Sequence, residues 1–317
     1  MTATAPSTPP APAATADHGL IAWLDSAAPA SRWQAACGQM WWRWRLLVAN
    51  RLALLGLVIV LGLLAVALLA PWLAPHPPLA GDLSLRLQPP SSTYWLGTDD
   101  QGRDILSRLI AGSRTTLYVV AVAAVLSAPL GVLIGAVSGY AGGWLDAVLM
   151  RLTDIFLAFP RLILALAFVA ALGPGLDNAV IAIAITAWPP YARLARAESL
   201  ALRRSDFIAA SRLLGASHTR LVLGHVLPLC LPSVLIRVTL DMAGMILAAA
   251  GLGFLGLGAQ PPLPEWGAMI AAGRQFLLGA WWVAAAPGAA IFIVSLGFNL
   301  LGDGLRDALD PRAQQRG

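Results

Sequence analysis

The residues that could carry chemistry are few and do not cluster along the chain. Gly251, Gly253 and Gly256 match the GxGxxG pattern of dinucleotide-binding turns, but such a turn follows a strand and opens a helix. Here the pattern ends an apolar run, so we expect a helix exit with a flexible or re-entrant turn. The two cysteines form no CxxC pair and the four histidines form no HExxH or HxxxH pattern, so we expect no metal or redox site. The sequence contains no GxSxG motif that would indicate an intramembrane enzyme.

Two charged residues, Arg237 and Asp241, lie inside an otherwise apolar run. On a helix, residues four apart share one face. A lone charge at bilayer depth costs about 2.5–3.5 kcal/mol, so we expect neither to face lipid unpaired. Three interpretations stay open: a mutually neutralising pair at a subunit interface, a pair that borders a translocation path, or Arg237 reaching to the inner membrane interface.

The composition of the 317-residue chain decides its class. It is 58% hydrophobic and 12% charged, with a mean hydropathy of +0.72, whereas soluble domains carry about 25% charged residues. The sequence therefore predicts an all-α integral membrane protein with several spans. Residues 1–30 are rich in Ala, Pro and Thr, and we expect a disordered cytoplasmic N-terminal tail over residues 1–45.

Six apolar runs could cross a membrane. We predict a first transmembrane helix and an extracytoplasmic loop over residues 46–112, a transmembrane core over 113–302 with a cytoplasmic loop at 193–220, and a cytoplasmic C-terminal tail over 303–317. The six spans are 46–70, 115–140, one within 147–172, 176–192, 221–250 and 277–301.

The distribution of positive charge predicts the orientation. All 21 basic residues are Arg. With the N-terminus inside, thirteen of them fall in cytoplasmic segments and five in outside loops, so both termini are expected in the cytoplasm. The Arg residues sit at the edges of apolar runs, which disfavours nucleic acid as a partner.

Two glycine-containing segments each have two interpretations. Gly131, Gly135 and Gly139 form a small-residue stripe that could serve packing within the chain or contact with another subunit. The segment 97–104 could be a substrate-side lid, or a turn followed by a short interfacial helix, which we favour.

A short helix is predicted in the Arg-rich loop before the fifth span. Ser205 and Asp206 are good N-cap residues and Gly215 is a good C′ residue. Phe207, Ala210 and Leu214 share one face of this helix, which could lie on the membrane or dock in a partner's groove. Periodicity alone leaves both possibilities open.

The segment 206–215, with Leu-Pro at 227–228, resembles the "EAA" loop of ABC-importer permeases. Other motifs occur in the order expected for the second permease subunit of dipeptide, oligopeptide and nickel importers. These are 97–104, 158–160, 173–175, 188–189, 253–258, 260–262 and 299–311. The resemblance covers about residues 45–311. It departs at Ala209, where the loop has Glu, and at its third residue, Ser211, so an acidic contact to the ATPase is lost.

The resemblance implies the ABC importer permease fold: six transmembrane helices, the last five forming the shared core, in a bacterial inner membrane. It implies a complex with a second homologous permease, two ATP-binding-cassette ATPase subunits and an extracytoplasmic substrate-binding protein. ATP and Mg would bind the ATPases, because this chain has no P-loop motif, and the chain would catalyse no chemical step. The solute would be a peptide or a related small solute, such as a nickel chelate or a glutathione-like thiol. The expected ATPase-coupling residues are Asp206, Phe207, Ala209, Ala210, Ser211, Leu214 and Gly215.

The alternative is an ion-coupled secondary transporter. Such a protein would carry an internal repeat with broken helices at matching positions, and we find no such repeat in the sequence.

Overall fold

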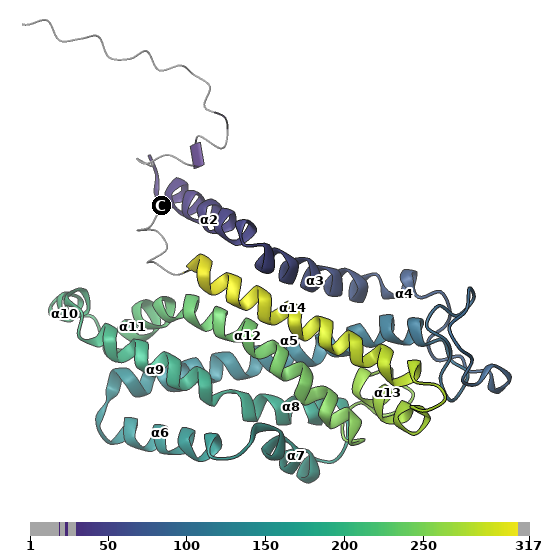
Figure 1. Ribbon diagram of the computed structural model, residues 1–317. Helices are drawn as coiled ribbons and strands as arrows, with labels where there is room; N and C mark the ends of the chain where they lie inside the picture. The colour runs from purple at the N-terminus through teal and green to yellow at the C-terminus, as the bar shows by residue number, and fades with distance from the viewer. Residues whose placement is uncertain (1–18, 20–22, 25–29, 310–317) are drawn as a thin grey trace, which may run out of the picture.

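The computed structural model describes residues 19, 23–24 and 30–309. Within these ranges the regular elements are helices, and the long ones run along a common direction (Figure 1). The tail predicted for residues 1–45 lies largely outside the described residues. Where it is described, it differs from the prediction, because α2 (Arg32–Ala49) is an 18-residue helix.

The predicted first span is divided by Asn50. The spanning helix is α3 (Arg51–Leu68), and the side chain of Asn50 caps it by accepting from the backbone N–H groups of Leu52 and Ala53 at 3.0 and 3.3 Å. The short helix α4 (Ala70–Leu73) follows, with Pro71 in its first turn. Residues 46–49 thus belong to α2 and not to the span.

Three further helices are long and apolar enough to cross a membrane. They are α5 (Ile105–Ala141), the continuous run His218–Phe254, and α14 (Trp282–Leu309). The run comprises α11 (His218–Leu221), a π-helical turn (Val222–Val226) and α12 (Leu227–Phe254). Helix α5 begins ten residues before the predicted span, and α14 begins five residues later than predicted. Because α14 continues to Leu309, the first half of the predicted tail at 303–317 is helical.

The third and fourth spans are not single straight helices. α6 (Gly143–Leu157) and α7 (Arg161–Leu172) are bent by 92° at a break that contains Pro160, where the ring of proline prevents a continuous helix. α8 (Leu176–Ala187) has 12 residues, fewer than the roughly 20 needed to cross a bilayer. After Trp188 the chain continues as α9 (Pro189–Arg203). The six-span count is therefore approximate.

Two short helices flank the bundle at opposite ends (Figure 1). α10 (Asp206–Leu213) lies at the end where α14 finishes, and α13 (Trp266–Gly273) lies near the loop that connects α4 to α5. The sequence predicted α10 but not α13.

The glycine stripe of α5 is covered by this chain's own α9. A Cβ atom added at Gly131, Gly135 or Gly139 would lie 2.4, 2.2 or 2.6 Å from a backbone carbonyl oxygen. The three oxygens belong to residues that are spaced by four and begin just before α9. Those residues are Trp188, Ala192 and Arg196. Intrachain packing is therefore the role that the structure gives to this stripe.

Candidate functional site

Helix α10 forms where its terminal residues predict it. Gly215 has a φ of +84°, and its N–H donates to the Arg212 carbonyl while the Ala216 N–H donates to that of Ser211, at 2.9 and 3.1 Å. These two bonds are a Schellman C-cap. At the other end Ser205 occupies the N-cap, but its hydroxyl donates backward to the Leu202 carbonyl at 2.6 Å instead of capping.

One face of α10 is fixed to the bundle. Ile208 is fully buried in a cluster with Tyr140 of α5 and Leu221 of α11. Arg212 Nε donates to the Tyr140 hydroxyl at 3.2 Å, and that hydroxyl lies 3.2 Å from His218 Nδ1. Ile208 was not predicted as a contact, because it does not lie on the helical face formed by Phe207, Ala210 and Leu214.

The other face of α10 points away from the described chain. Leu213 and Leu214 are 90% and 89% exposed, and Phe207 is 41% exposed beside the ring of His225. Asp206, Ala209, Ala210 and Gly215 are also exposed, while Ser211 is half-buried and its hydroxyl donates to the Phe207 carbonyl. Two neighbouring leucines left almost fully in the open are typical of a surface that a partner covers.

The charged pair of the fifth span is formed in the structure. Arg237 Nη2 lies 3.3 Å from Asp241 Oδ1, and Arg237 Nε donates to Oδ2 at 3.3 Å. The Asp241 side chain is 14% exposed and that of Arg237 is 45% exposed. The carboxylate therefore points into the protein, while part of the guanidinium does not.

A third charge, Arg161 at the start of α7, joins this pair. Its Nη1 lies 3.7 Å from where a Cβ on Gly244 would be, one turn along α12 from Asp241. Asp241 is the opposite charge near Arg161, without a direct hydrogen bond to its Nε or Nη2. Among the described residues, the buried Nε and Nη2 of Arg161 have no hydrogen-bond partner. In the sequence, Arg161 lies within the predicted span at 147–172, and no spacing links it to Asp241.

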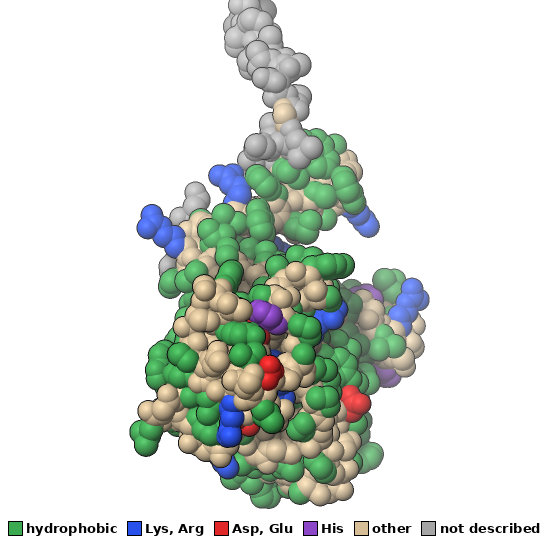
Figure 2. Space-filling model, turned by 90° about the vertical axis from the view of Figure 1, so that its right-hand side faces the viewer, with side chains coloured by type: hydrophobic (Ala, Val, Ile, Leu, Met, Phe, Trp, Pro, Cys, Tyr) green, Lys and Arg blue, Asp and Glu red, His purple; other side chains and the backbone are tan. Residues whose placement is uncertain are grey.

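The segment 97–104 is a buried turn that starts α5. Arg103 Nε donates to Asp99 at 2.7 Å, and Arg108 Nε lies 3.5 Å from the same carboxylate. Asp104 caps α5 by accepting from the Ser107 N–H at 2.9 Å. The turn we favoured is present, but the helix after it is the long α5 and not a separate interfacial helix. Figure 2 shows the bundle from this end, where charged side chains are few among hydrophobic ones.

The GxGxxG pattern ends α12 and makes room for Glu265. Gly256 has a φ of +76° just after the helix, and a Cβ on Gly253 would lie 1.8 Å from a Glu265 oxygen. Glu265 accepts from the backbone N–H groups of Gly267 and Ala268, both at 2.7 Å, and so caps α13. Burial raises the pKa of the Glu265 carboxyl. The predicted helix exit is confirmed.

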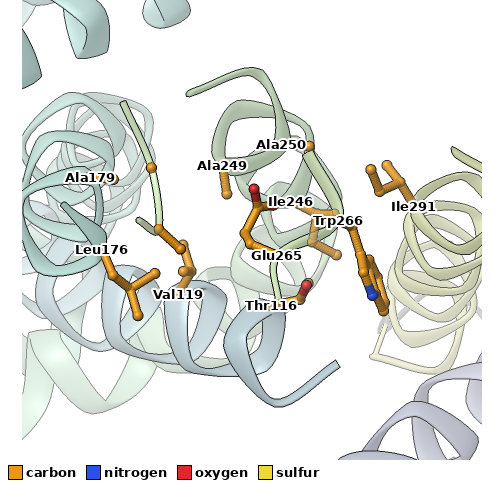
Figure 3. A pocket seen from close by; sticks show the side chains of 12 residues that line it. Thr116, Val119, Leu176, Ala179, Ile246, Ala249, Ala250, Glu265, Trp266 and Ile291 are labelled. Carbon is orange, nitrogen blue, oxygen red and sulfur yellow. The ribbon is translucent and has the colours of Figure 1, made fainter. Parts of the chain in front are cut away.

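Glu265 borders a pocket between α5, α8 and α12 (Figure 3). Its cavity of about 10 Å³ has room for about one water molecule and is too small for a solute. Among the described residues, no group of three His, Cys, Asp or Glu side chains could hold a metal ion.

The chain matches two family models and several curated proteins. Residues 131–315 match the binding-protein-dependent transport system inner membrane component, and residues 38–90 match the N-terminal TM domain of oligopeptide transport permease C. The chain is 46% identical to the probable D,D-dipeptide transport system permease protein DdpC of Escherichia coli, over 84% of this chain and 90% of that protein. It is 45% identical to the dipeptide transport system permease protein DppC of Alkalihalophilus pseudofirmus, over 86% and 90% of the two chains. The nickel transport system permease protein NikC of Escherichia coli is 44% identical, over 81% and 93%.

A solved structure shows the same fold. The inward-facing MetNI methionine ABC transporter matches with a TM-score of 0.53 at 22% identity, over 65% of this chain and 98% of that chain. The fold, the family models and relatives above 40% identity lead to one assignment. The chain is a multi-pass inner-membrane protein and belongs to the family of binding-protein-dependent transport system inner membrane components.

Proposed function

We propose that this chain forms half of the translocation path of an ATP-driven importer for peptides or a related small solute. The observation that carries the proposal is α10, which exposes Leu213 and Leu214 while Ile208 fixes it to the bundle. The peptide class is supported by relatives named for dipeptide transport, and the nickel permease extends it to related solutes such as a nickel chelate. An ion-coupled secondary transporter gains no support from these relatives.

The complex would contain a second homologous permease, two ATPase subunits and an extracytoplasmic binding protein. ATP and Mg would bind the ATPases, and this chain would perform no chemical step. Both termini and α10 would lie in the cytoplasm. This orientation is supported by the Arg distribution and by the position of α10 at the end of the bundle where α14 finishes (Figure 1).

The exposed face of α10 would dock in an ATPase groove. Through Ile208, Arg212 and Tyr140, a displacement of α10 would reach the ends of α5 and of the His218–Phe254 run. Rigid-body movement of packed helices is a common way to switch a cavity between two openings.

The charged cluster would border the translocation path. A peptide carries a carboxylate and an amine, which would meet the guanidinium groups and the carboxylate of Asp241, respectively. This assignment is supported by the buried nitrogens of Arg161 that lack a partner and by the partial exposure of Arg237.

Ala210→Asp tests the coupling surface. Ala210 is exposed on α10, and a carboxylate there would be buried without a partner when the ATPase docks. We expect at least a tenfold loss of ATPase stimulation by substrate-loaded binding protein in the reconstituted complex, with basal ATP hydrolysis retained.

Ala80→Asp is the matched control, because Ala80 is exposed in the loop at the opposite end of the bundle. It should keep full stimulation. Normal stimulation in Ala210→Asp, in a complex that assembles fully, would contradict docking through this face.

A further inference from the structure

Helix α2 carries an apolar stripe that is largely exposed, although the ring of Trp33 packs on that of Trp23. Its residues Trp33, Cys37, Met40 and Trp44 are spaced by four, three and four, which places them on one helical face. Trp33 is 71% exposed, Met40 69% and Trp44 49%. We call these four residues the α2 stripe.

Two contacts hold α2 in place. Gln34 is buried and its Nε2 donates to the Trp23 carbonyl at 2.8 Å. Near the other end of α2, Leu47 is buried against Ala53 of α3 and Ala308 of α14. Leu47 follows Trp44 by three residues on the same helical face, so this face meets the bundle at the C-terminal end of α2. Beyond that contact, Trp33, Met40 and Trp44 stay exposed.

The charge of α2 is of one sign. The helix contains Arg32, Arg43 and Arg45 and no acidic residue, and Arg51 follows at the start of α3. Arg32 and Arg43 are exposed. This arrangement complements an anionic surface and no acidic side chain of α2 offsets it.

The position of α2 puts it where the chain enters the bilayer. Only Asn50 separates it from the membrane-spanning α3. Tryptophan rings concentrate at the boundary between headgroups and acyl chains, and a basic helix with an apolar face binds in that plane. A groove on a protein partner explains the exposed apolar residues, but it does not require the two tryptophans of the stripe beside the exposed Arg32 and Arg43.

We propose that α2 lies on the membrane surface and binds anionic phospholipids. The α2 stripe enters the boundary between headgroups and acyl chains, and Arg32 and Arg43 contact phosphate groups. This is a lipid-binding surface separate from α10 and from the charged cluster of the fifth span, and it does not depend on what the importer carries.

Cys37 gives direct access to the α2 stripe. The other cysteine, Cys230, is fully buried, so a nitroxide label can be placed on Cys37 of the assembled complex in nanodiscs of phosphatidylcholine and phosphatidylglycerol. We expect strong relaxation by oxygen, which partitions into lipid, and weak relaxation by a water-soluble nickel chelate. The matched control is Cys37→Ser with Gln39→Cys, because Gln39 is exposed on a different side of α2, and it should show the reverse pattern.

Lipid selectivity is measured with a fluorophore on Cys37 and nitroxide-labelled lipids. We expect phosphatidylglycerol to quench more strongly than phosphatidylcholine, and Arg32→Gln with Arg43→Gln to lower that preference by about fivefold per arginine, the equivalent of about 1 kcal/mol each. Arg220→Gln, an exposed arginine outside α2, should leave the preference unchanged.

Three results would overturn the proposal. Equal access of the nickel chelate to Cys37 and Gln39→Cys would mean that the stripe faces water. A Cys37 label that is immobile and shielded from both oxygen and nickel would mean that a protein covers it. Equal quenching by the two lipids would remove the headgroup contact.

Discussion

At the scale of residues, Asp241 is the group on which the intramembrane charges depend. Arg237 forms an ion pair with this carboxylate, and Arg161 lies close enough to be attracted by it. We expect Asp241→Asn to lower the free energy of unfolding, because it leaves two cations without a counter-charge. Breaking a buried ion pair costs about 3–5 kcal/mol. Arg237→Gln should cost under about 1 kcal/mol, because its side chain is partly exposed and Arg161 still balances Asp241. Thermal unfolding of the purified complex measures both.

Exchanging the two charges, Arg237→Asp with Asp241→Arg, should not restore stability. The new arginine would stand near Arg161, so two like charges would replace the present attraction. Recovery to the wild-type unfolding temperature would mean that Arg161 does not belong to the cluster. If recovery is absent in the exchange but present when Arg161→Gln is added, the three-charge description holds.

The Arg237–Asp241 pair could be predicted from the sequence and Arg161 could not, for a physical reason. A separation of four residues on one helix brings two side chains together whatever the rest of the fold does. Arg161 lies near Asp241 because α7 packs near α12. The spacing of residues along the chain does not specify that packing. The same holds for Ile208, whose burial depends on Tyr140 and Leu221.

At the scale of elements, contact between α5 and α9 depends on glycine. Gly135→Ala would place a methyl group 2.2 Å from the Ala192 carbonyl oxygen, so the helices must separate. We expect a loss of about 1–3 kcal/mol in stability. Gly62→Ala in α3 is the matched control, because a Cβ there meets nothing within 4 Å of the described chain; it should be neutral or gain up to about 1 kcal/mol.

Both variants are compared by thermal unfolding of purified protein in one detergent. Equal unfolding temperatures would show that α5 and α9 do not pack as the structure has them. A loss in Gly62→Ala alone would point instead to a partner on α3.

Elements with strong local signals were predictable and those set by packing were not. Helix α10 has a C′ glycine and a polar N-terminus, and it forms within one residue of its predicted end. Helix α13 has eight residues between a Pro-rich turn and Arg274, too few for periodicity to reveal. Helix α2 was missed because its tryptophans and arginines lack the long apolar run of a span. Pro160 in the sequence is typical of a break in a helix, but the sequence does not specify the angle between α6 and α7.

At the scale of the whole molecule, the two ends of the bundle should face different compartments. Ser91 is exposed in the loop before α5, and Thr219 is exposed in α11, next to α10. In a Cys37→Ser background, Ser91→Cys should react with a membrane-impermeant maleimide in intact spheroplasts. Thr219→Cys should react only after lysis or in inverted vesicles. The opposite pattern would reverse the proposed orientation and place α10 outside the cell.

The length of α5 has a consequence for how far a small movement can be carried. Its 37 residues extend about 55 Å at 1.5 Å per residue, from the Asp99–Arg103 turn at one end to Tyr140 beside α10 at the other. Tilting such a rod by about 5° about one end displaces the other end by about 5 Å, nearly one helical turn. The buried ion pairs of this turn fix the N-terminal end of α5, so the helix would tilt about that end. Weakening these ion pairs would let the far end of α5 shift as well, so the same displacement of α10 would tilt the helix less.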